Sequence, residues 1–210
     1  MSGSFLTKFG TIVESSLCTR FADDVIEASD GNLYFSVAST KFDLHNWYLD
    51  LLEAKPHGQL LKYDPSSNET SILLDDLGFA NGVELSRDQD YLVVCETWKF
   101  RCLKYWLKGE DKGKTEIFVE NLPGGPDNIN LAPDGSFWIA LLQLTSDGLE
   151  FVHTFQADGK IIRKFDDSEG KVMTFVTAAF EFEDHLYLGS LNSKFVGKLP
   201  LQDTILKSVD

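Results

Sequence analysis

The stretch "PGGPDNINLAPDGSFWIAL", residues 123–141, carries the pattern that decides the fold. A short strand pattern, "DNINLAP", leads into the tight-turn residues Asp134 and Gly135, and the apolar run "FWIAL" follows them. Two such runs around a tight turn are typical of a β-hairpin. The first strand opens with Asp127 and Asn128, although an apolar strand needs neither side chain.

This hairpin pattern recurs along the chain. It is repeated in "DDVIEASDGNLYFSVAS" (23–39), "NGVELSRDQDYLVVCET" (81–97) and "VTAAFEFEDHLYLGSL" (176–191). Further strand pairs separated by turn residues are legible at 58–77, 101–122 and 155–167. A unit of four strands repeated at intervals of about 45 to 60 residues is typical of a propeller blade. The sequence therefore predicts an all-β chain, an incomplete β-propeller of about four blades.

One segment interrupts the strand pattern. Residues 41–58 place apolar side chains at helical spacing and stop at Pro56, which predicts a short helix inserted between strands of the first blade. It is expected either to cap one face of the propeller or to pack on a blade edge. The chain of 210 residues is otherwise expected to form a single partial domain, with an atypical segment at 1–20 and about four blades over 21–210.

The composition restricts the classes of partner. A hydrophobic content of 43% is sufficient for a core, and a formal net charge of −14 disfavours nucleic acid because phosphate backbones are repelled. No run approaches the ~20 apolar residues of a membrane span, and "MSGSFLTKFGTIVESS" lacks the apolar region of a secretory signal. We therefore expect a small-molecule substrate, no nucleic acid and no membrane span.

Three cysteines and one asparagine sequon need separate interpretation. Cys95 and Cys102 flank a predicted hairpin turn, so a cross-strand disulfide is geometrically conceivable, but two separately buried thiols are expected. Cys18 lies apart from both. Asn68-Glu69-Thr70 matches the acceptor pattern for N-glycosylation, which indicates an exposed turn but also occurs by chance.

Polar side chains recur at one position of the repeat. Asp23, Asn81 and Asp127 each stand seven residues before the turn acid of their own hairpin. The first strand of each propeller blade lines the central channel, so this position would gather oxygen-bearing side chains at one end of it. Calcium takes six to eight oxygen ligands, so the sequence predicts a metal or polar-substrate site. The alternative is that such residues only bond the backbone where a strand begins.

The residues next to this position complete the candidate set. Asp24 and Asn128 follow one residue later in two hairpins. In the fourth hairpin the position holds Val176, followed by Thr177, so the ring is incomplete there. The candidate metal ligands are thus Asp23, Asn81, Asp127 and Asn128.

Much of the chain resembles the strictosidine synthase-like proteins of plants. The resemblance runs from Phe21 to Gln202 and is carried by residues 58–109, 123–143 and 182–201, with the motifs "FANG", "PDNI" and "LYLGSL". It implies a propeller of the six-bladed type, related to paraoxonases and gluconolactonases. Against that pattern the chain starts late and is shortened near residues 141–162.

The resemblance also implies a cofactor and an activity. Paraoxonase relatives hold a channel Ca2+ at positions that correspond to Asp23, Asn81 and the pair Asp127 and Asn128. This favours a metal-dependent hydrolase of the lactonase or esterase type, with Asp24 as the nearest candidate for a general base. One ligand of those relatives and the stretch with their histidines have no counterpart here. The four histidines, 45, 57, 153 and 185, are expected at the surface.

Two other activities stay open. The family's name reaction is an amine-aldehyde condensation in alkaloid biosynthesis, but Thr177 occupies the position of the synthase's catalytic glutamate and cannot shuttle a carboxylate's proton. Glu181 and Glu183 are expected to be surface or turn residues. The other alternative is a catalytically silent, truncated propeller that binds a partner or does not fold alone, with exposed blade edges through which it could self-associate. Relatives usually enter the secretory pathway, vacuole or endoplasmic reticulum, and the compartment of this chain is left open.

Overall fold

The computed structural model describes residues 20–145, 148–166, 173 and 175–201, without the side chains of 143–157 and 163–166. Contacts between Cα atoms divide the chain into two compact units, residues 1–81 and 82–210. The expectation of a single domain stays a prediction.

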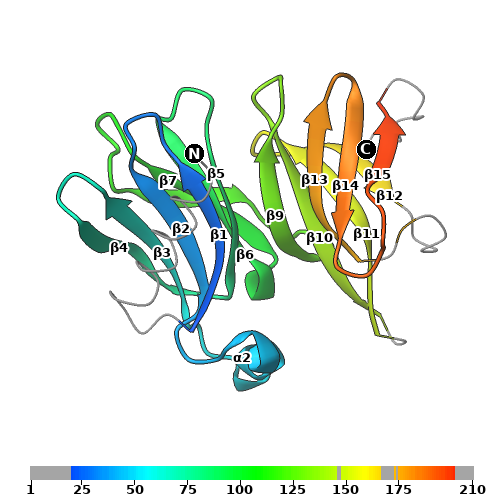
Figure 1. Cartoon of the computed structure of the whole chain (residues 1–210), viewed down its shortest axis with the longest axis horizontal. Helices are drawn as coiled ribbons and strands as arrows, with labels where there is room; N and C mark the ends of the chain where they lie inside the picture. Colours follow the sequence, from blue (N-terminus) through cyan, green and yellow to red (C-terminus); the bar gives the residue numbers. More distant parts are fainter. Residues whose placement is uncertain (1–19, 146–147, 167–172, 174, 202–210) are drawn as a thin grey trace. The chain divides into compact units, whose positions relative to one another are not determined.

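The first unit contains one antiparallel sheet with the strand order β1-β2-β3-β4 (Figure 1). Its strands are β1 (Phe21–Glu27), β2 (Leu33–Ser39), β3 (Gly58–Asp64) and β4 (Glu69–Leu77). The expected inserted helix is confirmed between β2 and β3, as a 3-10 turn η1 (Leu44–Asn46) and the helix α2 (Trp47–Glu53). Asp43 caps η1 through its carboxylate, and α2 ends where Ala54 turns left-handed.

The second unit contains three further antiparallel sheets, ordered β5-β6-β7-β8, β12-β11-β10-β9 and β13-β14-β15. Their strands are β5 (Ala80–Leu85), β6 (Tyr91–Glu96), β7 (Arg101–Trp106), β8 (Thr115–Val119), β9 (Gly125–Leu131), β10 (Phe137–Thr145), β11 (Gly148–Ala157), β12 (Ile161–Asp166), β13 (Val176–Phe182), β14 (His185–Ser190) and β15 (Gly197–Pro200). A second 3-10 turn, η2 (Thr97–Lys99), joins β6 to β7. The boundary between the units falls within β5.

The hairpin turns are stabilised by residues within the turns themselves. In the β1–β2 turn, Asp30 accepts the Asn32 N–H at 3.0 Å, and in the β9–β10 turn Asp134 accepts the Ser136 N–H at 2.9 Å. The glycine of each turn has a positive φ, 84° at Gly31 and 94° at Gly135, which favours a residue without a side chain. The acidic turn residues are therefore structural.

Apolar side chains pack between successive sheets of the second unit. Residues from β6 to β10 form one buried cluster: Val93, Cys95, Cys102, Phe118, Val119, Leu122, Ile129, Phe137, Ile139 and Leu141. A smaller cluster joins β10 to the third sheet through Trp138, Ala179 and Leu186. The indole Nε1 of the fully buried Trp138 donates to Glu181 at 2.6 Å, so Glu181 is a half-buried structural acceptor and not a simple surface residue.

The expectation of two separate thiols is wrong. Cys95 and Cys102 form a disulfide, and neither side chain is exposed. The register of β6 and β7 pairs the two residues directly, because η2 and Phe100 return the chain with the cysteines facing each other. A spacing in sequence alone does not fix this register, which the strand pairing decides.

Candidate functional site

The predicted polar position coincides with an irregularity in the first strand of two sheets. In β1, the paired residues jump from Ala22 to Val25, so Asp23 and Asp24 lie together opposite a single residue of β2. This is a β-bulge, which bends a strand and turns its side chains away from the regular alternation.

The same irregularity occurs in β9. Pro126 pairs with Leu141 and Ile129 pairs with Ile139, so Asp127 and Asn128 lie together opposite Ala140. The repeat in the sequence aligns Asp23 and Asp24 with Asp127 and Asn128. In the structure both pairs lie on β-bulges, in separate sheets.

The third sheet repeats the bulge without the acid. In β13, Val176 and Ala178 pair with the adjacent residues Ser190 and Gly189, which leaves Thr177 as the inserted residue. The backbone site is thus retained where the carboxylate is missing.

The amide of Asn128 connects two of the predicted residues. Its Nδ2 donates to the backbone oxygen of Thr177 at 2.8 Å and lies 3.4 Å from Oδ1 of Asp127. Asn130 makes a parallel contact, donating Nδ2 to the Ala179 oxygen at 3.0 Å. These two amides join β9 to β13, and because Nδ2 of Asn128 serves this purpose, Oδ1 is the atom left to act as a ligand.

Gly82, at the start of the second unit, packs closely against the β9 bulge. A Cβ on Gly82 would lie 2.6 Å from the Asp127 oxygen, 2.6 Å from the Ile129 nitrogen and 2.8 Å from Cα of Asn128. Only glycine permits this approach of β5 to the β9 bulge. Asn81 is buried, with 4% of its surface exposed.

The acidic pair in β1 has an unusual electrostatic environment. Desolvation by the surrounding protein, and then repulsion from Asp24, raise the pKa of Asp23 to about 7. Asp23 as a whole residue is nevertheless exposed, so water screens part of this shift in its pKa. The carboxylate of Asp24 accepts the Val25 N–H at 2.8 Å, and the backbone N–H of Asp24 donates to Ser36 Oγ at 3.0 Å.

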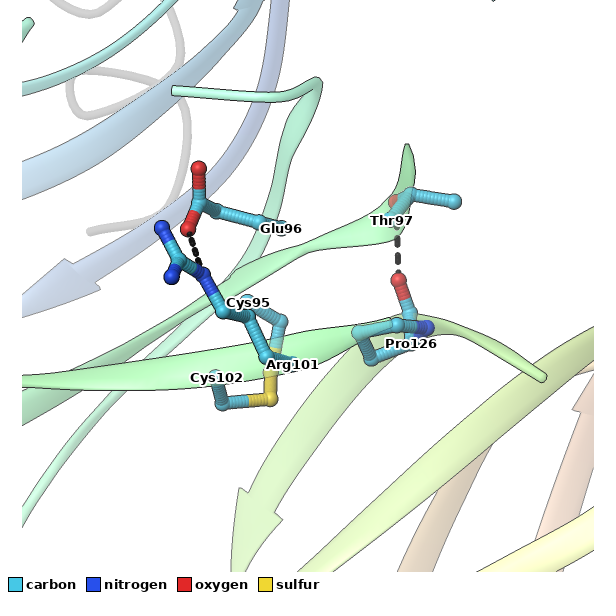
Figure 2. The surroundings of a disulfide bond; sticks show 6 residues. All are labelled: Cys95, Glu96, Thr97, Arg101, Cys102 and Pro126. Carbon is cyan, nitrogen blue, oxygen red and sulfur yellow. Dashed lines mark hydrogen bonds and ion pairs between the residues drawn. A yellow bond between two sulfur atoms is a disulfide. The ribbon is translucent and has the colours of Figure 1, made fainter. Parts of the chain in front are cut away.

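A hairpin tip that the sequence did not single out supports the start of β9 (Figure 2). Oγ1 of the buried Thr97 donates to the Pro126 oxygen at 2.8 Å, one residue before Asp127. A Cβ on Gly125 would lie 2.8 Å from atoms of Thr97, so the two segments touch. The disulfide closes the base of this tip. The clue in the sequence is the cysteine pair around "ETWKFR", since a closed hairpin presents its tip in a fixed orientation.

A cluster of ion pairs also holds the same tip. The carboxylate of Glu96 is fully buried and binds Lys99 Nζ at 2.7 Å and Arg101 Nε at 2.6 Å. Figure 2 shows the pairing of Glu96 with Arg101 beside the disulfide. A buried carboxylate needs such compensation, so this cluster has a structural explanation.

The candidate ligands do not all fall in one unit. Asp23, Asp24 and Asn81 lie in the first, and Asp127, Asn128 and Thr177 lie in the second. The complete ring therefore stays a prediction. In the part of the chain that the structure describes, no three side chains of His, Cys, Asp or Glu converge as a metal-binding group.

The histidines lie elsewhere. His57 contacts Glu53 at 3.1 Å at the end of α2, and His185 Nδ1 lies 2.7 Å from the Glu183 oxygen in the β13–β14 turn. His45 is exposed, and the side chain of His153 lies outside the described ones.

The successive antiparallel sheets, with polar pairs on bulges of their first strands, define a protein of the β-propeller class. The family model for strictosidine synthase matches residues 23–110. Strictosidine synthase-like 4 from Arabidopsis thaliana is 35% identical over 87% of this chain and 55% of its own length. Strictosidine synthase-like 6 from the same plant is 49% identical over 58% of this chain and 32% of its own length. The mouse adipocyte plasma membrane-associated protein is 33% identical over 87% of this chain and 52% of its own length.

Solved structures support the same fold. The luciferin-regenerating enzyme aligns with a TM-score of 0.58 at 18% identity, over 83% of this chain and 56% of that one. The calcium-binding protein regucalcin from Agrobacterium tumefaciens gives a TM-score of 0.55 at 16% identity, over 82% and 54% of the two chains. The chain is similar to the strictosidine synthase-like proteins and has an incomplete propeller fold, as expected. It spans about half the length of the relatives that match most of it. Within the described residues, the helices are too short and polar to cross a membrane.

Proposed function

We propose that this protein is a Ca2+-dependent hydrolase of the lactonase or esterase type. The observation that carries the proposal is the pair of equivalent β-bulges, which place Asp23 with Asp24 in β1 and Asp127 with Asn128 in β9. Bulges are over-represented next to active sites because they re-aim side chains. Two solved neighbours, regucalcin and a Xanthomonas campestris gluconolactonase, are described as a calcium-binding protein and a lactonase.

The donor atoms of the candidate residues fit a hard cation. Asp23, Asn81, Asp127 and Asn128 offer only carboxylate and amide oxygens, which calcium prefers over the nitrogen and sulfur ligands of softer metals. The contact of Asn128 Nδ2 with the Thr177 oxygen orients that amide so that Oδ1 is its ligand atom. A bound calcium ion supplies Lewis-acid polarisation of the substrate carbonyl.

The protein's own residues supply orientation and proton transfer. Asp24 is the candidate general base, and its carboxylate, which also accepts the Val25 N–H, takes the proton of the attacking water. The water oxygen bonds to the carbonyl carbon, the ester C–O bond breaks, and the leaving alkoxide regains a proton. The fixed Asn128 amide keeps the β9 bulge in register with β13 during this reaction.

Calorimetric titration with calcium chloride tests the proposal. Asn128→Ala and Asn130→Ala are matched variants, because each loses one amide contact from β9 to a β13 oxygen. We expect Asn128→Ala to lose at least tenfold in calcium affinity and Asn130→Ala to bind as the wild type does. Lactone hydrolysis should fall in Asn81→Ala and Asp127→Ala. The proposal is contradicted if the wild type does not bind calcium, or if the two variants hydrolyse the lactone as fast as the wild type does.

The amine-aldehyde condensation is the alternative enzyme activity. Its test is incubation with tryptamine and secologanin, followed by mass spectrometry. Thr177 makes product formation unexpected, and Thr177→Glu is the variant in which a carboxylate returns to the β13 bulge. Product from the wild type would establish the condensation and displace the hydrolase assignment.

Self-association is the remaining candidate property, and one observation favours it. Large apolar side chains are exposed on β13, at Phe180 and Phe182, and in the connection from β14 to β15, at Leu191, Phe195 and Val196. Exposed apolar side chains of this size are candidates for contact with another chain. Size-exclusion chromatography of the wild type and of Phe182→Ser distinguishes the cases, since self-association through this surface predicts a smaller species for the variant.

A further inference from the structure

The turn between β3 and β4 contains Asn68, a residue that has no role in the proposed hydrolase reaction. Asn68 begins the sequence Asn68-Glu69-Thr70, which is the acceptor pattern for N-glycosylation. No other Asn-X-Ser/Thr triplet occurs in the chain. A triplet of this kind becomes meaningful only if its place in the fold and the protein's compartment both permit the modification.

The fold presents Asn68 at the surface. Residues 65–68 connect β3 to β4 and are all exposed, and the register pairs Asp64 with Glu69 across the turn. The connection is held by Asp64, whose Oδ1 accepts from both the N–H and the hydroxyl of Ser66. Asn68 ends the turn with a φ of 57°. Its side chain therefore stands on a fixed turn with open space for a bulky group.

The side-chain hydrogen bond of Asn68 survives glycosylation. Oδ1 accepts from the Tyr63 hydroxyl at 2.9 Å, whereas a glycan is attached to Nδ2. In the transfer reaction Nδ2 bonds to the anomeric carbon of a lipid diphosphate-linked oligosaccharide. The bond from that carbon to the diphosphate oxygen breaks, the lipid diphosphate leaves, and Nδ2 gives up one proton. The amide oxygen is unchanged, so its bond to Tyr63 is retained.

A separate observation indicates the compartment. Cys95 and Cys102 form a disulfide and are both fully buried. Structural disulfides form in oxidising compartments such as the lumen of the endoplasmic reticulum, and they are rare in the cytosol. N-glycosylation takes place in that same lumen. The disulfide and the sequon lie in different sheets and different units, so they are independent indications of one route.

We infer that Asn68 is an N-glycosylation site and that the protein folds in the lumen of the endoplasmic reticulum. The glycan then stands at the beginning of β4, which is an edge strand of its sheet and exposes Ile72. Exposed edges invite pairing with other chains, and a bulky hydrophilic group beside one obstructs that pairing.

The test is the glycosylation state of the protein made from its full-length coding sequence in plant cells. Treatment with a peptide N-glycosidase that accepts plant glycans should increase gel mobility, and the peptide containing Asn68 should be recovered as the aspartate form. Asn68→Gln and Thr70→Ala should abolish the mobility shift, while Thr70→Ser should keep it. Asn121→Gln is the matched control, because Asn121 is exposed with the same φ of 57° but has no sequon.

Two results overturn the inference. One is an unmodified Asn68 peptide from the wild-type protein, a measurement that does not depend on whether a variant folds. The other is alkylation of Cys95 and Cys102 without prior reduction, which would show free thiols and remove the argument for an oxidising compartment. A modified Asn68 together with alkylation of these cysteines only after reduction supports it.

Discussion

The contact between the hairpin tip and the β9 bulge can be tested by replacing Thr97 with valine. The substitution keeps the side-chain shape and exchanges the hydroxyl that donates to the Pro126 oxygen at 2.8 Å for a methyl group. Thr97 is fully buried, so water does not replace the lost donor. The change therefore removes the hydrogen bond that joins the hairpin tip to Pro126, one residue before Asp127.

The expected loss of stability follows from opposing contributions. Withdrawing a partner from a buried polar group costs about 1–3 kcal/mol. Burying a methyl in place of the hydroxyl returns about 0.8 kcal/mol. The net free energy of unfolding should thus fall by about 0.2–2.2 kcal/mol. Thr97→Ser retains the donor and loses only a methyl group, so it serves as the control for packing.

The assay combines urea unfolding, followed by tryptophan fluorescence, with calcium titration of the same samples. If the contact positions the start of β9, Thr97→Val should lower both stability and calcium affinity, the latter by about threefold or more, whereas Thr97→Ser should keep the affinity. Equal stability of Thr97→Val and wild type would refute the hydrogen-bond argument. A destabilised valine variant with wild-type calcium affinity would refute the positioning argument alone.

Three further changes have defined outcomes. In calcium-free buffer, Asp23→Asn should stabilise the protein increasingly, relative to the wild type, as pH rises from about 4 to 8. The pKa of Asp23 is about 7 in the folded protein against 3.8 for the free group, so native Asp23 holds a proton that the unfolded chain releases, and the stability of the wild type falls over that range. Urea midpoints of both proteins at several pH values measure this trend, and a difference in midpoint that does not change with pH would contradict it. Replacing Cys95 and Cys102 with alanine should cost about 2–3 kcal/mol, because the bridge closes a loop with a sequence separation of 7, and reductant should affect only the wild type in the same urea assay. Gly82→Ala should destabilise by about 1–3 kcal/mol, since its Cβ meets the Asp127 oxygen at 2.6 Å; thermal unfolding unchanged from wild type would argue against close contact of β5 with β9.

The sequence by itself determined the strands, the turns and the position of the polar pairs. Each of these depends on residues that are close in the chain. The alternation of apolar side chains selects strands, and Asp30 and Asp134 close their turns through bonds to residues two positions away. Counting back from such turns located Asp23 and Asp127, and both fall within bulges of the first strand. The short helix before Pro56 followed from the same local reasoning.

Only the tertiary structure decided what touches what across the sheets. The disulfide depended on the β6–β7 register, Asn128 meets a carbonyl oxygen 49 residues away, and Glu181 accepts from Trp138, 43 residues away. Thr97 likewise reaches Pro126 across 29 residues. No local propensity encodes these contacts, because they result from how whole sheets bury their apolar faces against each other, and that packing sets the partner of each polar side chain.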